Sequence, residues 1–201
     1  MRILAFSDLH CDLEAASRLV EKSAEADLVV GAGDFASMHE GLEETIAALS
    51  PITTETVLVP GNNETVDELR DTASRLWPSA KVLHGEAAEL AGVQVFGLGG
   101  GIPVTPWEWS FDLDEGEAAQ LLEGLPSQEP ILVVHSPPKG HCDKSAGEEH
   151  LGSTAILDAI ERTSPRLAVC GHIHEAWGER SRIGETDVVN LGPDGTFLEL
   201  D

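Results

Sequence analysis

The sequence predicts an α/β protein in which two mixed β-sheets pack face to face and helices cover their outer faces. Three observations lead to this fold class. Apolar runs typical of strands alternate with helical patterns in the first part of the chain, later strands follow one another closely, and the elements suffice for two packed sheets. Such a chain forms a four-layer α/β/β/α sandwich. Its 201 residues can bury a substantial core, and we expect a single domain over residues 1–201.

The first part of the chain repeats a strand–loop–helix unit. Each expected strand is an apolar run that ends near turn residues, and each expected helix carries apolar residues on one face at helical spacing. This repetition favours parallel strands with helices on the faces of the sheet. The expected strands are residues 2–6, 28–31 and 56–59, and the expected helices are residues 12–25, 41–49 and 64–76.

The second part of the chain changes character, because its first three strands have little between them. Short connections favour antiparallel pairing, which we expect among these three strands. A later helix has Ser153 as its N-cap and Pro165 after its end, and residues 193–195 form a turn. The expected strands are residues 81–84, 87–91, 93–98, 131–135, 166–170, 187–191 and 196–200, and the expected helix is residues 152–163.

The chain is strongly acidic, with 36 Asp and Glu residues against 12 Lys and Arg residues and a formal net charge of −24. Such a charge repels nucleic acid and anionic membranes, so we expect neither as a partner. Self-repulsion also destabilises the compact state, and concentrated salt relieves it by screening. The composition is typical of proteins from salt-loving cells, and an ordinary acidic protein is the alternative.

The sequence favours a cytoplasmic protein. The apolar stretch near the start is too short for a secretory signal, and the longest uncharged run, residues 90–107, contains glycines and prolines that do not suit a membrane span. Cys11, Cys142 and Cys170 form an odd set without CxxC spacing, so reduced thiols are expected. No motif decides between a monomer and a homodimer.

Polar side chains cluster where the expected strands end. In open α/β sheets, the carboxyl ends of the strands form the edge at which ligands bind. Glycine precedes three of these positions, as Gly33, Gly61 and Gly171, and it allows a tight turn or a close backbone approach. The side chains at the strand ends are Asp8, His10, Asp34, Asn62, Asn63, His135, His172 and His174.

Each of these motifs has an ordinary structural explanation when it is taken alone. Asp8 and His10 could belong to a helix-capping loop, Gly33-Asp34 could be a turn, and His135 could be a hydrogen-bonded core histidine. Their joint occurrence favours a metal site, because every motif supplies Asp, Asn or His at a strand end.

The motifs together resemble the signature of the calcineurin-like metallophosphoesterases. That signature is Asp-x-His, Gly-Asp, Gly-Asn-His, a lone His and Gly-His-x-His, in this order. The resemblance covers nearly the whole chain, from Asp8 to His174. The matching residues are Asp8/His10, Gly33-Asp34, Gly61-Asn62, His135 and Gly171-His172-Ile173-His174.

The resemblance implies two divalent metal ions. Mixed imidazole and carboxylate ligands suit Mn, which we expect first, and also Fe, Zn, Co or Ni. The implied ligands are Asp8, His10, Asp34 and His174 for the first ion and Asp34, Asn62, His135 and His172 for the second, with Asp34 bridging both.

The implied reaction is hydrolysis of a small phosphate ester. Two such ions lower the pKa of a shared water, so that a bridging hydroxide is available at neutral pH, and they neutralise charge that develops in the transition state. Attack would be direct and in line, without a phosphoenzyme. We expect Asp34 and Asn63 to be the catalytic residues.

Asn63 is also the one departure from the family pattern, which usually has a histidine at this position. That histidine is thought to protonate the leaving group or to bind the phosphoryl oxygen. Asparagine donates a hydrogen bond but transfers no proton, and loss of a general acid costs about 10²- to 10⁴-fold. We therefore expect weak activity on poor leaving groups and better activity on activated diesters. His39, His141 and His150 are candidate replacement donors, or else surface and loop residues.

Two further segments bear on the substrate. The residues from His135 onward are similar to a phosphodiesterase-type branch of the family, which includes cyclic-nucleotide phosphodiesterases, and to small archaeal members. Trp107, Trp109 and the glycines at 99–101 could line the mouth of the pocket, or could form a flexible turn with two packing aromatics.

Three functions compete on this sequence. The first is a phosphodiesterase or phosphatase that acts on a small phosphate ester. The second is a catalytically weak or inactive metal-binding scaffold protein on the same fold, which Asn63 supports and the intact ligand positions oppose. The third is a DNA nuclease, which the acidic charge disfavours.

Overall fold

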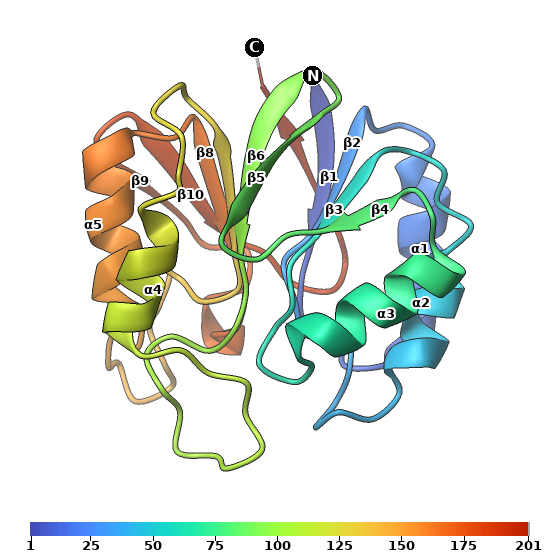
Figure 1. The fold of residues 1–201 in the computed structure, drawn as a ribbon, viewed down its shortest axis with the longest axis horizontal. Coiled ribbons are helices and arrows are strands. Elements are labelled where there is room, and N and C mark those ends of the chain that lie inside the picture. The colour runs from blue at the N-terminus through green and yellow to red at the C-terminus, as the bar shows by residue number, and fades with distance from the viewer. Residues whose placement is uncertain (201) are drawn as a thin grey trace.

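Two β-sheets lie face to face, with helices on their outer faces, in the computed structural model, which describes residues 1–200 (Figure 1). This arrangement confirms the four-layer α/β/β/α sandwich, and both sheets are mixed. Within the described residues, no helix is long and apolar enough to cross a membrane.

The first sheet has the strand order β11-β1-β2-β3-β4, and three helices cover its outer face. Its strands β1 to β4 pair in parallel, and β11 joins the edge antiparallel to β1. The strands are β1 (Arg2–Phe6), β2 (Leu28–Gly31), β3 (Thr56–Leu58), β4 (Ala80–Val82) and β11 (Thr196–Glu199), and the helices are α1 (Leu13–Ser23), α2 (Leu42–Leu49) and α3 (Val66–Leu76).

The second sheet has the order β5-β6-β7-β8-β10-β9, with two helices outside it. The central strands β6, β7, β8 and β10 are parallel, and β5 and β9 pair antiparallel at the two edges. The strands are β5 (Glu86–Leu90), β6 (Val93–Leu98), β7 (Ile131–Val134), β8 (Leu167–Cys170), β9 (Arg180–Ile183) and β10 (Thr186–Asn190), and the helices are α4 (Glu115–Leu122) and α5 (Thr154–Thr163).

Alternation along the strands produces the layers. In β1, Ile3 belongs to the apolar cluster between the two sheets, whereas the next residue, Leu4, belongs to the cluster beneath α1, α2 and α3. Successive strand residues point to opposite faces, so one strand serves two cores. In β7, Val133 likewise joins the central cluster while Leu132 packs beneath α4 and α5.

Most expected elements are present within a few residues of their predicted bounds, including the Ser153 N-cap of α5. The antiparallel pairing of β5 with β6 is confirmed. The same prediction is wrong for β4, which pairs in parallel with β3 in the first sheet. The chain turns at Gly85, whose φ is 71°, and passes from one sheet to the other.

Three elements were not predicted, and the shortest of them is a single 3₁₀ turn, η1 (His174–Ala176). Helix α4 is short and buries only Ala118 and Leu122, and its clearest signal is a capping box between Asp114 and Glu117. Strand β9 is an edge strand with mostly exposed polar residues, so it lacks the apolar run by which the other strands were predicted.

Candidate metal centre

The loops that follow β1, β2, β3, β7 and β8 bring the proposed ligand side chains to one edge of the two sheets. Two groups of acidic and histidine side chains form there, and within each group the ligand atoms lie within 4.8 Å of one another. The first group is Asp8, His10 and His174, and the second group is Asp34, His135 and His172. Sequence motifs that are far apart along the chain therefore meet in space, as the predicted strand ends required.

The backbone at these ligands is held in an uncommon conformation. Asp8, His10, Asp34 and His172 have φ values of 55°, 43°, 59° and 68°, in the left-handed region. Each such non-glycine residue costs on the order of 1–3 kcal/mol, and such residues cluster at functional sites. At Gly61, an added Cβ would lie 2.0 Å from Oδ1 of Asp34, so glycine is needed for this approach.

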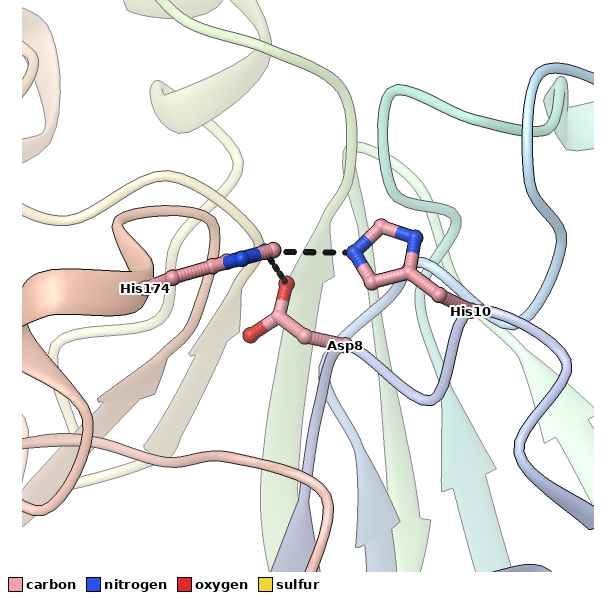
Figure 2. Close-up of side chains that lie close together, drawn as sticks. All are labelled: Asp8, His10 and His174. Atoms are coloured by element: carbon pink, nitrogen blue, oxygen red, sulfur yellow. Dashed lines mark hydrogen bonds and ion pairs between the residues drawn. The ribbon is translucent and has the colours of Figure 1, made fainter.

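In the first group, two histidines face each other beside a carboxylate (Figure 2). The Nε2 atoms of His10 and His174 are 3.1 Å apart, and Nε2 of His174 is 3.9 Å from Oδ1 of Asp8. Two imidazole nitrogens at this distance must share a proton or a cation, because two lone pairs would repel each other. This group therefore has the chemistry of a cation site.

Hydrogen bonds and a ring contact with neighbouring residues orient the side chains of the first group. Oδ2 of Asp8 accepts from Ser7 Oγ at 2.5 Å and from Trp177 Nε1 at 3.0 Å. The backbone N–H of His172 donates to the same carboxylate, 3.1 Å from Oδ1. The Trp177 ring also lies against the His174 ring, with 4.4 Å between centroids. One side chain, Trp177, thus positions two members of the group, as partners behind metal ligands commonly do. Asp12 caps helix α1, so the helix-capping explanation does not apply to Asp8 and His10.

In the second group, His135 is fully buried and its tautomer follows from its contacts. Its Nδ1 is 2.8 Å from the carbonyl oxygen of Ala32, which can only accept, so Nδ1 carries a proton. Its Nε2 faces Oδ1 of Asn62 at 3.2 Å and Oδ1 of Asp34 at 3.5 Å. Burial lowers the pKa of His135, but the charge and hydrogen bond of Asp34, together with the Asp8 charge and the Ala32 carbonyl, raise the pKa to about 9. These carboxylate and amide oxygens thus favour a positive charge at this position.

Asp34 lies between the two groups. Its Oδ2 is 3.5 Å from Nε2 of His10 in the first group, and its Oδ1 is 3.5 Å from Nε2 of His135 in the second. Burial would raise the pKa of Asp34, but the charge and hydrogen bond of His135 hold it well below its usual range. The carboxylate is therefore ionised and placed to serve both groups.

Asn62 joins the second group through its side-chain oxygen. Its Nδ2 donates to Ser110 Oγ at 2.9 Å, and Ser110 Oγ donates in turn to Asp112 Oδ1 at 2.6 Å. This chain of hydrogen bonds leaves Oδ1 of Asn62 facing His135 and His172, with 3.1 Å to Nδ1 of His172. Ser110 therefore sets which end of the amide faces the centre.

The buried Asn63 side chain makes its hydrogen bonds within the protein. Its Nδ2 donates to Oδ2 of Asp34 at 2.8 Å, and its Oδ1 accepts from the backbone N–H of Met38 at 2.8 Å. Its backbone N–H donates to Oδ1 of Asp34 at 2.9 Å. Asn63 thus orients the shared carboxylate, which the sequence did not predict, and the second N–H of its amide remains for a ligand.

The three candidate replacement donors are engaged elsewhere. His39 bonds Glu68 Oε2 at 3.0 Å and the carbonyl oxygen of Trp109 at 2.7 Å, and His141 Nδ1 is 2.7 Å from Ser181 Oγ. His150 Nδ1 is 2.5 Å from an oxygen of the buried Asp143. Within residues 1–200, none of the three histidines lines the cavity over the ligand groups.

Sequence reasoning missed Glu64, which ties the second and third ligand loops together. Its fully buried carboxylate accepts from the backbone N–H groups of Asp34, Ala36 and Gly61, at 2.9, 2.9 and 2.6 Å. Burial, and then the Asp34 charge, raises its pKa to about 7. The available signal was an acidic residue directly after Asn62 and Asn63, in a turn whose backbone N–H groups need acceptors.

A cavity of about 640 Å³ opens over both groups. Asn63 and five of the proposed ligands line it, namely His10, Asp34, Asn62, His172 and His174. Carboxylate, imidazole and amide donors that converge in two adjoining groups fit two divalent cations of the Mn, Fe, Co, Ni or Zn type. The centre is therefore a candidate dinuclear metal site with room for an organic ligand beside it.

This fold with paired ligand groups is that of a metallophosphoesterase. The sequence model described as the calcineurin-like phosphoesterase superfamily domain matches residues 1–197. The chain therefore belongs to the calcineurin-like phosphoesterase superfamily, which confirms the predicted family.

Curated relatives match parts of longer proteins. Metallophosphoesterase domain-containing protein 1 of Homo sapiens is 38% identical over 140 residues, which cover 66% of this chain and 39% of that protein. A UPF0046 protein of Caenorhabditis elegans is 32% identical over 116 residues, which cover 53% of this chain and 27% of that protein. The matched region thus spans less than half the length of either relative.

Solved structures share the fold at low sequence identity. The protein TT1561 of Thermus thermophilus has a TM-score of 0.78 at 23% identity, covering 96% of this chain and 90% of that chain. A dimetal phosphatase from Danio rerio has a TM-score of 0.62 at 12% identity, covering 96% and 88%. An archaeal phosphodiesterase has a TM-score of 0.57 at 14% identity, covering 96% and 84%.

Proposed function

We propose that this chain is a phosphodiesterase that uses two divalent metal ions, Mn²⁺ first among them, to hydrolyse a small phosphate ester. The observation that carries the proposal is Asp34, whose two carboxylate oxygens face two separate ligand groups 3.5 Å away on each side. The superfamily membership and the phosphodiesterase and dimetal phosphatase among similar structures support it.

The residues divide the chemical work between them. Divalent ions, when held by the two groups, would supply charge that activates water and neutralises the phosphate. Asp34 would hold both groups at a fixed separation, and Asn63 would keep its carboxylate oriented through Nδ2. The hydrogen bond from Nδ1 of His135 to Ala32 would keep Nε2 free to act as a ligand.

The preference for diesters rests on the cavity lining, which among the described residues has no lysine or arginine to meet the second charge of a monoester. The preference for activated leaving groups rests on Asn63. An amide donates hydrogen bonds but gives no proton to a leaving oxygen. Leaving groups that depart as stable anions would therefore react well, and alkoxide leaving groups poorly. A catalytically weak metal-binding scaffold is the second candidate, and this same residue favours it.

Hydrolysis of bis-p-nitrophenyl phosphate and of p-nitrophenyl phosphate tests the proposal. The protein is stripped of metal, reloaded with Mn²⁺, Co²⁺, Ni²⁺ or Zn²⁺, and assayed at low and high salt, with folding checked by circular dichroism. Metal-dependent turnover that favours the diester is expected. Absence of turnover from folded, metal-loaded protein would contradict the proposal and favour the scaffold.

A further inference from the structure

Large exposed apolar side chains gather at the mouth of the cavity. Over residues 1–200, the large hydrophobic side chains with the greatest exposure are Leu13, Met38, Val104, Trp107, Leu151 and Trp177. Four of these, Met38, Val104, Trp107 and Leu151, line the cavity, and Trp177 lies against the ligand His174. In a chain with a net charge of −24, most of the large apolar side chains that are exposed thus lie beside the candidate metal centre. Exposed apolar patches of this kind mark binding sites.

One wall of the cavity comes from the mouth loop, residues 99–112, which carries two stacked tryptophans. The rings of Trp107 and Trp109 are nearly parallel, with 5.7 Å between centroids and 12° between planes. Trp107 is 50% exposed, so a stacked ring is presented at the cavity mouth. Aromatic rings prefer to extend such offset stacks with a further flat ring.

The mouth loop is fastened to the ligand groups. The carbonyl oxygen of Trp109 accepts from Nε2 of His39 at 2.7 Å, and the N–H of Phe111 donates to the carbonyl oxygen of Asn62 at 2.9 Å. Ser110 bonds the Asn62 side chain, as described above. These bonds connect the loop backbone beside the stacked rings to the metal centre, and both tryptophans line the cavity, as the first interpretation of this segment expects.

The described residues in the remaining walls include no cationic side chain that could pair with an anionic group. Leu151 and Ile173 add apolar surface, and the polar lining outside the ligands and Asn63 consists of Ser37, Thr105, Ser145 and Glu175. Among the described lining residues there is no lysine and no arginine. A second negative charge on a substrate would therefore meet Glu175 and the acidic chain without a matching cation.

We propose that the cavity selects phosphoesters whose organic group is a flat, apolar, uncharged aromatic ring, which stacks on Trp107 while the phosphate lies at the two ligand groups. This inference rests on the proposed function and adds its substrate class. Trp107 is then a residue that determines specificity and that takes no part in the reaction itself.

A matched series of diesters tests the inference with the leaving group held constant. Methyl, phenyl, 2-naphthyl and 4-carboxyphenyl phosphorothiolate diesters that share a 2,2,2-trifluoroethylthio leaving group all release the same aliphatic thiolate. Because this leaving group has no ring of its own, their kcat/KM values compare binding of the second group. We expect kcat/KM for the naphthyl ester to exceed that for the methyl ester by about 10- to 100-fold, because stacking and burial of the ring strengthen binding by about this factor. The carboxyphenyl ester should fall below the phenyl ester.

Two variants locate the effect. Trp107→Ala should remove most of the aryl preference, chiefly through KM, and Trp107→Phe should retain part of it. Leu13→Ala, at an exposed apolar side chain on α1 that does not line the cavity, is the matched control and should change nothing. Equal kcat/KM for methyl and naphthyl esters, or an aryl preference that survives Trp107→Ala, would overturn the inference and leave the proposed function intact.

A binding measurement tests the aromatic preference of the cavity without relying on hydrolysis. If no ester is hydrolysed, that result counts against the proposed function, and the binding measurement still tests this inference. Quenching of tryptophan fluorescence is titrated with phenylphosphonate and methylphosphonate on Mn²⁺-loaded protein. We expect phenylphosphonate to bind about tenfold or more tightly, and tighter binding should vanish in Trp107→Ala. Equal affinities of the two phosphonates would refute it.

Discussion

The two ligand groups differ in how the protein holds them. In the second group, His135 is fully buried and its ring is fixed by a backbone carbonyl, whereas in the first group the side chain of His174 is 47% exposed. His174 is oriented by the ring of Trp177, which is itself partly exposed. The second group is thus more deeply buried than the first, which is completed by an exposed side chain.

The supporting contacts differ in the same way. Glu64 binds the backbone of the loops that carry Asp34 and Asn62, and it is fully buried. The first group depends instead on side chains, Ser7 and Trp177, that hold Asp8. Rigid, buried support costs less to reorganise on binding, so we expect the second group to hold its ion more firmly than the first.

Replacing the one residue that serves both groups should have the largest effect. Asp34→Asn keeps the shape but removes the charge between His10 and His135, so both ions should be lost and turnover should fall by more than about 100-fold. Metal content by mass spectrometry and diester hydrolysis give the two readouts. Retention of two ions per chain would show that the groups are independent of Asp34.

Restoring a proton donor should act next most strongly. Asn63→His introduces an imidazole beside Asp34, and hydrolysis of an unactivated alkyl diester should rise by up to about 100-fold, with little change on bis-p-nitrophenyl phosphate. The side chain also loses the amide that bonds Oδ2 of Asp34 and the N–H of Met38, so metal content must be measured in parallel. An unchanged rate on the alkyl ester at full metal content would show that no general acid is missing.

The difference in burial predicts stepwise release of the ions. When a chelator is added to the loaded protein, the more exposed first group should lose its ion faster than the second. The His174→Ala variant should bind only about one ion per chain, at the second group. It should release this ion at the slower of the two rates seen in the wild type. Co²⁺ absorption followed in time distinguishes the two steps. A single phase in the wild type, at the same rate as in His174→Ala, would remove the distinction between the groups.

The sequence predicts the fold well, and it singles out side chains that the structure brings together in two groups, because both predictions depend on local patterns. Apolar periodicity marks the strands, and a ligand at a strand end needs only the right residue after the right run. Gly61 could be singled out because it directly precedes Asn62 at a strand end, and in the structure an added Cβ there would meet Asp34.

The sequence fails where a partner lies far along the chain. Trp177 bonds Asp8 across 169 positions and Ser110 bonds Asn62 across 48, and the sequence predicted neither contact. β4 was assigned to the wrong sheet for a related reason. A short connection between two strands has the same sequence features whether the second strand pairs with the first or joins the other sheet. Asn63 was singled out as the departure from the family pattern, but its bonds to Asp34 and Met38 depend on loops that only the folded chain brings together.

The smallest predicted effect separates the groups by their supporting residues. Trp177→Phe keeps an aromatic ring beside His174 but removes the N–H that bonds Asp8, so affinity for the first ion should fall by about tenfold. Ser110→Ala removes the acceptor that fixes the Asn62 amide, so affinity for the second ion should fall by a similar factor.

Calorimetric titration of Mn²⁺ into the metal-free variants reads the two affinities separately, and thermal unfolding of the metal-free proteins checks that the variants are otherwise intact. Each substitution should weaken one binding step and leave the other unchanged, because Trp177 contacts members of the first group and Ser110 contacts Asn62 at the second. If both steps weaken equally in either variant, Asp34 transmits the change between the groups. The two ligand groups would then behave as one site. Their different burial would affect how fast the ions enter and leave, and not how tightly they bind.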